Sequence, residues 1–209
     1  MDVSRRGFLG TVASVPFAGA FGGPTPSAAA GGSACALPES RAGFVQALAA
    51  RDAPDVLVFP GAAGWDDSIE RRVRSGRLVI FESGSGFAEA SALREQRAGL
   101  EAAFGLIIEH PITMWSEGRR PSYLDLVWPV PVRIRDFSFA VPVRGGEALG
   151  RLGALPVATL KRAGAGALLF LGSPVGPALW SGDPQAHKWL SSVLAAALSL
   201  GRRKASSSP

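Results

Sequence analysis

The chain has 209 residues, of which 47% are apolar and 19% charged, and this composition supports one folded domain with extensions. Its formal charge is +5, but Arg202, Arg203 and Lys204 supply three of these charges and the first ten residues supply one more. About +1 is left for the body of the chain, too little for a nucleic-acid surface, so we expect no nucleic-acid partner.

The N-terminus resembles a twin-arginine export signal. Ser4-Arg5-Arg6-Gly7-Phe8-Leu9 matches that motif at each specified position, and a mildly apolar stretch and Ala28-Ala29-Ala30 follow it. The resemblance implies a signal peptide over residues 1–30, a flexible linker over 31–39, and a periplasmic or extracellular location.

Cys35 is the single cysteine, so the chain forms no internal disulfide. It could carry a lipid, but Gly32-Ser33-Ala34 before it lacks the expected leucine, and we expect a soluble protein. Beyond the signal, the only long apolar stretch, Trp189 to Leu200, is too short to span a membrane.

Residues 40–201 are expected to fold as one α/β domain. Asp55 to Phe59 and Leu78 to Phe81 are short apolar runs, and the helix between them implies a parallel crossover. Pro60-Gly61 is expected to stop the first strand. The flanking helices are expected from Ser40, acting as a cap, to Arg51, from Asp66 to Arg74, and from Ala88 to Phe104.

The second half has more irregular strands. Leu106 to Trp115 is expected to be extended, and prolines over residues 121–142 predict edge strands from Tyr123 to Val143. A closing hairpin is expected from Leu155 to Gly172. Asp183 and Pro184 should begin a last helix that ends at Gly201, followed by a basic disordered tail over 202–209.

Two stretches are similar to class I glutamine-amidotransferase-like domains. They are Asp55-Val56-Leu57-Val58-Phe59, with the acidic helix and strand after it, and Gly164 to Ser173 before the last helix. The resemblance covers about residues 53–200 and implies a three-layer flavodoxin-like sandwich, with a mostly parallel sheet and a Pro-rich antiparallel or edge extension. That family relies on a cysteine at a strand-to-helix turn. Here the only cysteine is Cys35 in the linker, so the resemblance implies a non-catalytic accessory module.

The turn after the strand at Leu78 to Phe81 is the predicted ligand crevice, because open α/β sheets bind ligands past the carboxyl ends of their strands. Glu82 there could be a general base, a metal ligand or a hydrogen-bond acceptor, or it could instead cap a helix or pair with an arginine. The predicted ligand-binding residues are Gly61, Glu82, Ser83, Gly84, Ser85, Gly86 and Ser173.

An alternative is a small hydrolase or transferase that uses Glu82, Ser83 or Ser85, and His110. The serines do not fit Gly-x-Ser-x-Gly, and a turn of glycines and serines also has a purely structural explanation. Glu89 occupies the third glycine position of a dinucleotide fingerprint, and no histidine pair has metal-ligand spacing. We therefore expect no cofactor and no metal.

Aromatic residues gather around the Pro-rich segment, at Trp115, Tyr123, Trp128 and Phe137. Aromatics with arginine are typical of binding hot spots, although they could equally cover an open face of the sheet. The main hypothesis is thus an exported, non-catalytic module that binds a protein partner in the periplasm or a small polar ligand.

Overall fold

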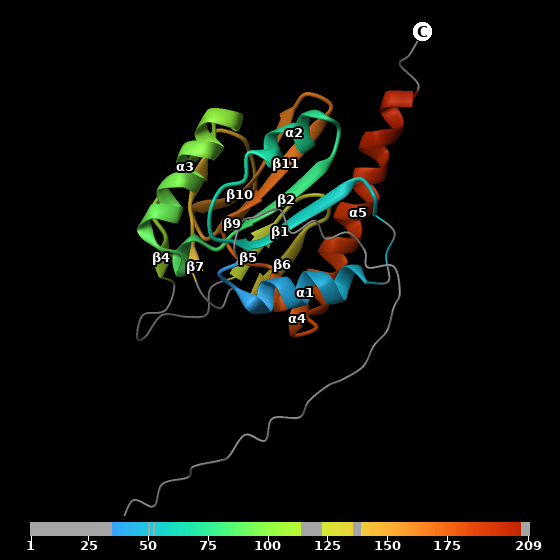
Figure 1. Ribbon diagram of the computed structural model, residues 1–209. Coiled ribbons are helices and arrows are strands. Elements are labelled where there is room, and N and C mark those ends of the chain that lie inside the picture. The colour runs from blue at the N-terminus through green and yellow to red at the C-terminus, as the bar shows by residue number, and fades with distance from the viewer. Residues whose placement is uncertain (1–34, 50, 52, 114–122, 136–138, 206–209) are drawn as a thin grey trace, which may run out of the picture.

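The computed structural model describes residues 35–49, 51, 53–113, 123–135 and 139–205 (Figure 1). The predicted signal peptide, Trp115 and Phe137 lie outside the described residues. The helices are α1 (Pro38–Leu48), α2 (Ser68–Arg74), the 3-10 turn η1 (Ser85–Phe87), α3 (Ala90–Phe104), α4 (Gly176–Trp180) and α5 (Pro184–Ala205). The strands are β1 (Val56–Ala62), β2 (Leu78–Ser83), β3 (Ile107–Ile108), β4 (Ile112–Thr113), β5 (Tyr123–Leu126), β6 (Val132–Arg135), β7 (Phe139–Ala140), β8 (Val143–Arg144), β9 (Glu147–Leu152), β10 (Leu155–Ala163) and β11 (Gly166–Leu171).

Seven strands form one curled, mixed sheet in the order β1-β2-β11-β10-β9-β5-β6. The predicted α/β class is confirmed. The prediction of a mostly parallel, flavodoxin-like sheet is wrong, because only β1, β2 and β11 run parallel. The remaining neighbours pair antiparallel, and short turns join β5 to β6, β9 to β10 and β10 to β11.

The parallel strands are the centre of the fold. All six residues of β2 are buried, as expected for a strand covered on both faces. The predicted crossover from β1 through α2 to β2 is confirmed. The expected stop of the first strand at Pro60 is wrong: β1 continues to Ala62, because an edge strand tolerates a residue without an N–H donor.

Helices cover both faces of the sheet, and each face has its own apolar core. In the view of Figure 1, α1 and α4 lie below the sheet, α2 lies above it and α3 lies to its left. Phe44, Leu179 and Trp189 bring α1, α4 and α5 into one core with the lower face. Ile69 and Leu100 bring α2 and α3 into the other.

Two helix ends differ from the expectation. The first helix begins at Pro38, a residue suited to a first turn, so Ser40 lies inside α1 and is buried instead of capping it. The last helix begins as predicted, since Asp183 Oδ1 accepts hydrogen bonds from the N–H groups of Gln185 (2.7 Å) and Ala186 (3.2 Å). It passes through Gly201 to Ala205, because a single glycine costs a helix only about 1 kcal/mol.

The Pro-rich segment contributes an internal strand as well as an edge. β5 lies between β9 and β6, contrary to the expectation of edge strands alone, while β6 is the edge. Pro129, Pro131 and Pro142 fall in the connections, where no ladder hydrogen bond is lost. None of the helices in the described ranges is both long and apolar enough to cross a membrane.

Candidate functional site

Glu82, the last but one residue of β2, is fully buried and joins three segments of the chain. Its Oε1 accepts a hydrogen bond from the N–H of Gly61 in β1 (3.2 Å). Its Oε2 accepts bonds from the N–H groups of Val175 (2.7 Å) and Gly176 (2.8 Å), where α4 begins. The carboxylate therefore ties together the carboxyl ends of β1 and β2 and the turn that follows β11.

The protonation of Glu82 is set by two opposing effects. Burial raises the pKa of the carboxyl, and this effect outweighs the hydrogen bonds that lower it, from Ser40 and from the N–H groups of Gly176, Val175 and Gly61. Ser40 Oγ makes no hydrogen bond of ordinary geometry, so the three backbone N–H groups are the main donors to this carboxylate. Within the described part of the chain, no other charged side chain shifts the pKa of Glu82.

Glycines let the backbones approach each other around this carboxylate. A Cβ on Gly84 would lie 2.3 Å from the carbonyl oxygen of Gly61, and one on Gly176 would lie 2.4 Å from the Cα of Ser40. The turns at the carboxyl ends of the parallel strands are thus packed directly on one another. The predicted crevice is filled by the protein itself at this point.

The two candidate serines form a second buried cluster with Gln96 of α3. Ser83 Oγ and Ser85 Oγ lie 2.7 Å apart and each can donate to Gln96 Oε1, at 2.7 and 2.5 Å. Gln96 Nε2 donates to the carbonyl of Ala62 (3.0 Å). The hydroxyls therefore face an amide and not a base, and an amide cannot activate a serine nucleophile.

The other predicted site residues do not join these clusters. His110 is exposed in the connection between β3 and β4, and no hydrogen bond links it to Ser83 or Ser85 in the described chain. Ser173 follows β11 and is buried, and its Oγ has no partner among the described residues. Gly86 is exposed, and a Cβ there would lie 2.4 Å from the ring of Phe139.

The aromatic segment divides between core and surface. Trp128 is half-buried, and its carbonyl accepts a hydrogen bond from Nε1 of the buried Trp189 (3.1 Å). Tyr123 is 45% exposed on β5. Trp128 thus fits the interpretation that the aromatics cover the sheet, and Tyr123 fits the interpretation that they form an exposed binding surface.

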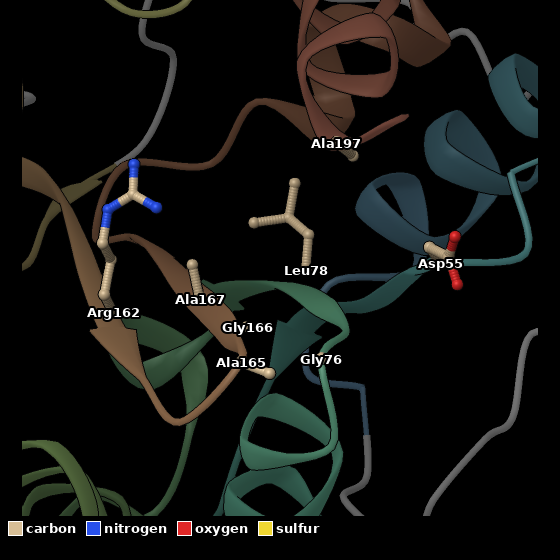
Figure 2. A pocket seen from close by; sticks show the side chains of 8 residues that line it. All are labelled: Asp55, Gly76, Leu78, Arg162, Ala165, Gly166, Ala167 and Ala197. Carbon is tan, nitrogen blue, oxygen red and sulfur yellow. The ribbon is translucent and has the colours of Figure 1, made fainter. Parts of the chain in front are cut away.

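A pocket of about 140 Å³ lies at the opposite, amino ends of the parallel strands. Figure 2 shows Leu78 at its centre, between Arg162 and Asp55, with Ala197 of α5 above. Asp55 is already paired with Arg77 at 3.2 Å. No group of three histidine, cysteine or acidic side chains that could hold a metal ion occurs in the described part of the chain.

Gln96 and Ser40 are the site residues that sequence reasoning missed. Gln96 stands on the apolar stripe of α3 between Leu93 and Leu100, and a polar residue at such a position signals a buried hydrogen-bond network. Serine is among the preferred residues for a helix cap, so the sequence predicts a cap at Ser40 and not a place inside α1.

No family model matches the sequence, and the comparison with curated proteins found no match. Solved structures do match. A β-galactosidase from Bacillus circulans sp. alkalophilus matches 76% of this chain and 28% of its own, with 15% identity and a TM-score of 0.50. An exo-β-1,4-mannosidase from Opitutaceae bacterium strain TAV5 matches 74% and 31%, with 13% identity and a TM-score of 0.53. A β-galactosidase from Rahnella sp. R3 matches 74% and 26%, with 13% identity and a TM-score of 0.51.

These likenesses concern the fold, and the chain spans about a quarter to a third of the length of the structures it matches. They correct the resemblance to glutamine-amidotransferase-like domains, which is wrong, since the matching structures are glycoside hydrolases. The apolar strands and glycine turns that suggested it are features of many α/β folds, and the mixed sheet departs from the expected parallel one.

Proposed function

We propose that this chain is an exported, non-catalytic binding module that works beside sugar-processing enzymes. The observation that carries the proposal is Glu82, the one buried carboxyl among the described residues. Both of its oxygens accept backbone hydrogen bonds, and its surface is inaccessible to a substrate. A general base must lie within hydrogen-bond reach of the proton it removes, so this carboxylate suits a structural role.

The chemistry of glycoside hydrolysis supports the same conclusion. Most glycosidases place two carboxyl groups on either side of the scissile bond, about 5–10 Å apart. The hydrogen bonds to Glu82 all come from backbone N–H groups, and no second carboxyl among the described residues affects its pKa. The sugar context comes from the matching structures, which are galactosidases and a mannosidase, and the partial length of the match suits an accessory module.

The second candidate is a hydrolase that uses Glu82, Ser83 or Ser85, and His110. The names of the matching glycoside hydrolases favour it. Such an enzyme would have to open the buried serine–glutamine cluster and bring His110 to it from the surface.

The test separates binding from turnover on the full chain. Calorimetric titration with galacto- and manno-oligosaccharides should show saturable binding, whereas 4-nitrophenyl β-galactoside and β-mannoside should release no more nitrophenol than with Ser85→Ala as the control. Hydrolysis abolished by Ser85→Ala or His110→Ala would establish the second candidate and overturn the first. Absence of both binding and hydrolysis would overturn both.

A further inference from the structure

The antiparallel half of the sheet presents an open polar face. The register of β5 places Asp125 opposite Arg133 of β6 on one side and opposite Arg151 of β9 on the other. Tyr123, two residues earlier on β5, is opposite Arg135. Residues two apart on a strand share a face, so these five side chains project from the same side of the sheet.

This side is separate from the cores. The alternate residues of β5 and β6 (Leu124, Leu126, Val132 and Ile134) are buried against α5 and its neighbours. On the opposite side, α2 packs over β2 and β11, in the parallel half of the sheet. Tyr123 remains 45% exposed there, the side chain of Arg133 is 66% exposed, and Arg135 and Arg151 are exposed as well.

The central arginine is held in place. Arg133 Nε and Nη2 donate to the two oxygens of Asp125, at 2.6 and 3.1 Å, and its guanidinium carbon lies 5.7 Å from the centroid of the Tyr123 ring. A bidentate pair combined with a cation–π contact restricts both the guanidinium and the ring before any ligand binds. Pre-ordering of this kind lowers the entropy cost of binding.

The charge of this face is positive. Three arginines against one aspartate leave a net charge of +2 on a surface only three strands wide. Arg133 and Arg151 stand two strand spacings apart, about 10 Å. Arg133 and Arg151 could therefore contact two anionic groups of one extended ligand at the same time.

We propose that the outer face of β5, β6 and β9 binds an acidic oligosaccharide, one whose sugar rings carry carboxylates. This inference rests on the proposed function and names its ligand class and surface. The Tyr123 ring offers a flat apolar surface for the C–H face of a sugar. Asp125 occupies the Nε–Nη2 edge of Arg133, which leaves Nη1 of Arg133 and the exposed guanidinium of Arg151, whose Nη1 also donates to the carbonyl of Ala154 (3.2 Å), to meet carboxylates. A single-stranded nucleic acid would call for several stacking rings, and a protein interface for a larger exposed apolar centre than Tyr123 and the neighbouring Val127 supply.

The test uses two sugars that differ only in charge. Tri-galacturonic acid and the neutral galactotriose of the same linkage are titrated into the full chain by calorimetry at low and moderate salt. We expect the acid to bind at least tenfold more tightly than the neutral sugar at low salt, and to lose most of that advantage as salt rises.

Variants locate the surface. Arg151→Ala and Tyr123→Ala should each weaken binding of the acid at least fivefold. Arg133→Lys keeps the charge but loses the paired hydrogen bonds to Asp125 that hold the side chain in place, and it should weaken binding similarly. Arg94→Ala, an exposed charge lost from α3, is the matched control and should leave binding unchanged. Unchanged melting temperatures would show that each variant is folded.

The outcomes separate this inference from the function on which it rests. Binding of neutral sugar that equals binding of the acid, or binding that Arg151→Ala and Tyr123→Ala leave intact, overturns the acidic-ligand surface while the binding module stands. Absence of binding to either sugar overturns both. Loss of a co-purifying protein, or of single-stranded DNA binding, in the same variants without an effect on the acid would assign this face to a different class of partner and overturn the inference.

Discussion

Replacing Glu82 is the most direct test of its structural role. Glutamine has almost the shape of glutamate but only one acceptor oxygen. If that oxygen keeps the bonds from Val175 and Gly176, the new NH₂ group faces the N–H of Gly61, 3.2 Å from the present oxygen. The side-chain NH₂ group and the N–H of Gly61 are then two buried hydrogen-bond donors that face each other without an acceptor. Leucine would remove all three acceptor contacts.

The magnitudes follow from the number of buried donors left without an acceptor. One unsatisfied buried group costs about 1–3 kcal/mol, so Glu82→Gln should destabilise the protein at pH 7 by about that amount. Glu82→Leu leaves three such groups and should cost at least about 3 kcal/mol, despite relief from burying a charge. Glu89→Gln, an exposed neutralisation just before α3, should change stability by less than about 0.5 kcal/mol.

Urea unfolding at equilibrium, followed by fluorescence and circular dichroism, gives the three free energies if the slopes with denaturant agree. The order of stability should be wild type, then Glu82→Gln, then Glu82→Leu. A leucine variant as stable as wild type would refute the reasoning, because it would mean that the three N–H groups need no acceptor.

Further outcomes concern pH, packing and the remaining candidates. Burial raises the pKa of Glu82, so the folded state holds this proton to a higher pH than the unfolded chain does. The contribution of Glu82 to the free energy of unfolding is therefore complete below pH 4.5, the ordinary pKa of a glutamate, and is lost as the pH rises through the folded-state pKa. When unfolding is measured at several pH values, the difference in stability between wild type and Glu82→Gln should shrink as the pH rises. A difference that grows with pH would contradict this reasoning. Gly43→Ala would put a Cβ 2.0 Å from the carbonyl oxygen of Gly176 and should cost about 3 kcal/mol in urea unfolding, and a smaller loss than for Glu89→Gln would show that α1 and α4 can separate freely. Gln96→Met removes the shared partner of the two buried serines and should cost about 1–3 kcal/mol, which thermal melting can check against an unchanged wild-type control. His110→Ala should alter stability by no more than about 0.5 kcal/mol, and a larger loss would reveal a contact that its exposure does not suggest.

The parts of the fold predicted from sequence are those fixed by local patterns. The apolar run of β2 and the Asp183 cap of α5 each depend on a few neighbouring residues, and both were identified. Strand order depends on which distant segments meet. No local pattern around Gly166 indicates that β11 pairs with β2 on one side and with β10 on the other. For that reason the sequence does not predict the mixed sheet.

The candidate site shows the same limit. Glu82 stood out because a carboxylate after a buried strand is unusual, and its position at the carboxyl end of β2 was correct. Its partners are backbone N–H groups, which every residue except proline carries, so side-chain types could not reveal them. Only the three-dimensional arrangement shows that Glu82, a candidate base in the sequence, links three segments of the chain.

That tie has a consequence for the order in which the chain folds. Glu82 and its partner Val175 lie 93 positions apart, and β11, the central neighbour of β2, is the last strand of the sheet to be synthesised. Until it emerges from the ribosome, one edge of β2 has backbone N–H and C=O groups without a strand partner, and its carboxylate lacks two of its three donors. Late closure of a parallel pair is slow and leaves the unfinished chain open to aggregation. A protein built in this way would gain from a chaperone that shields its N-terminal half until residue 176 is free.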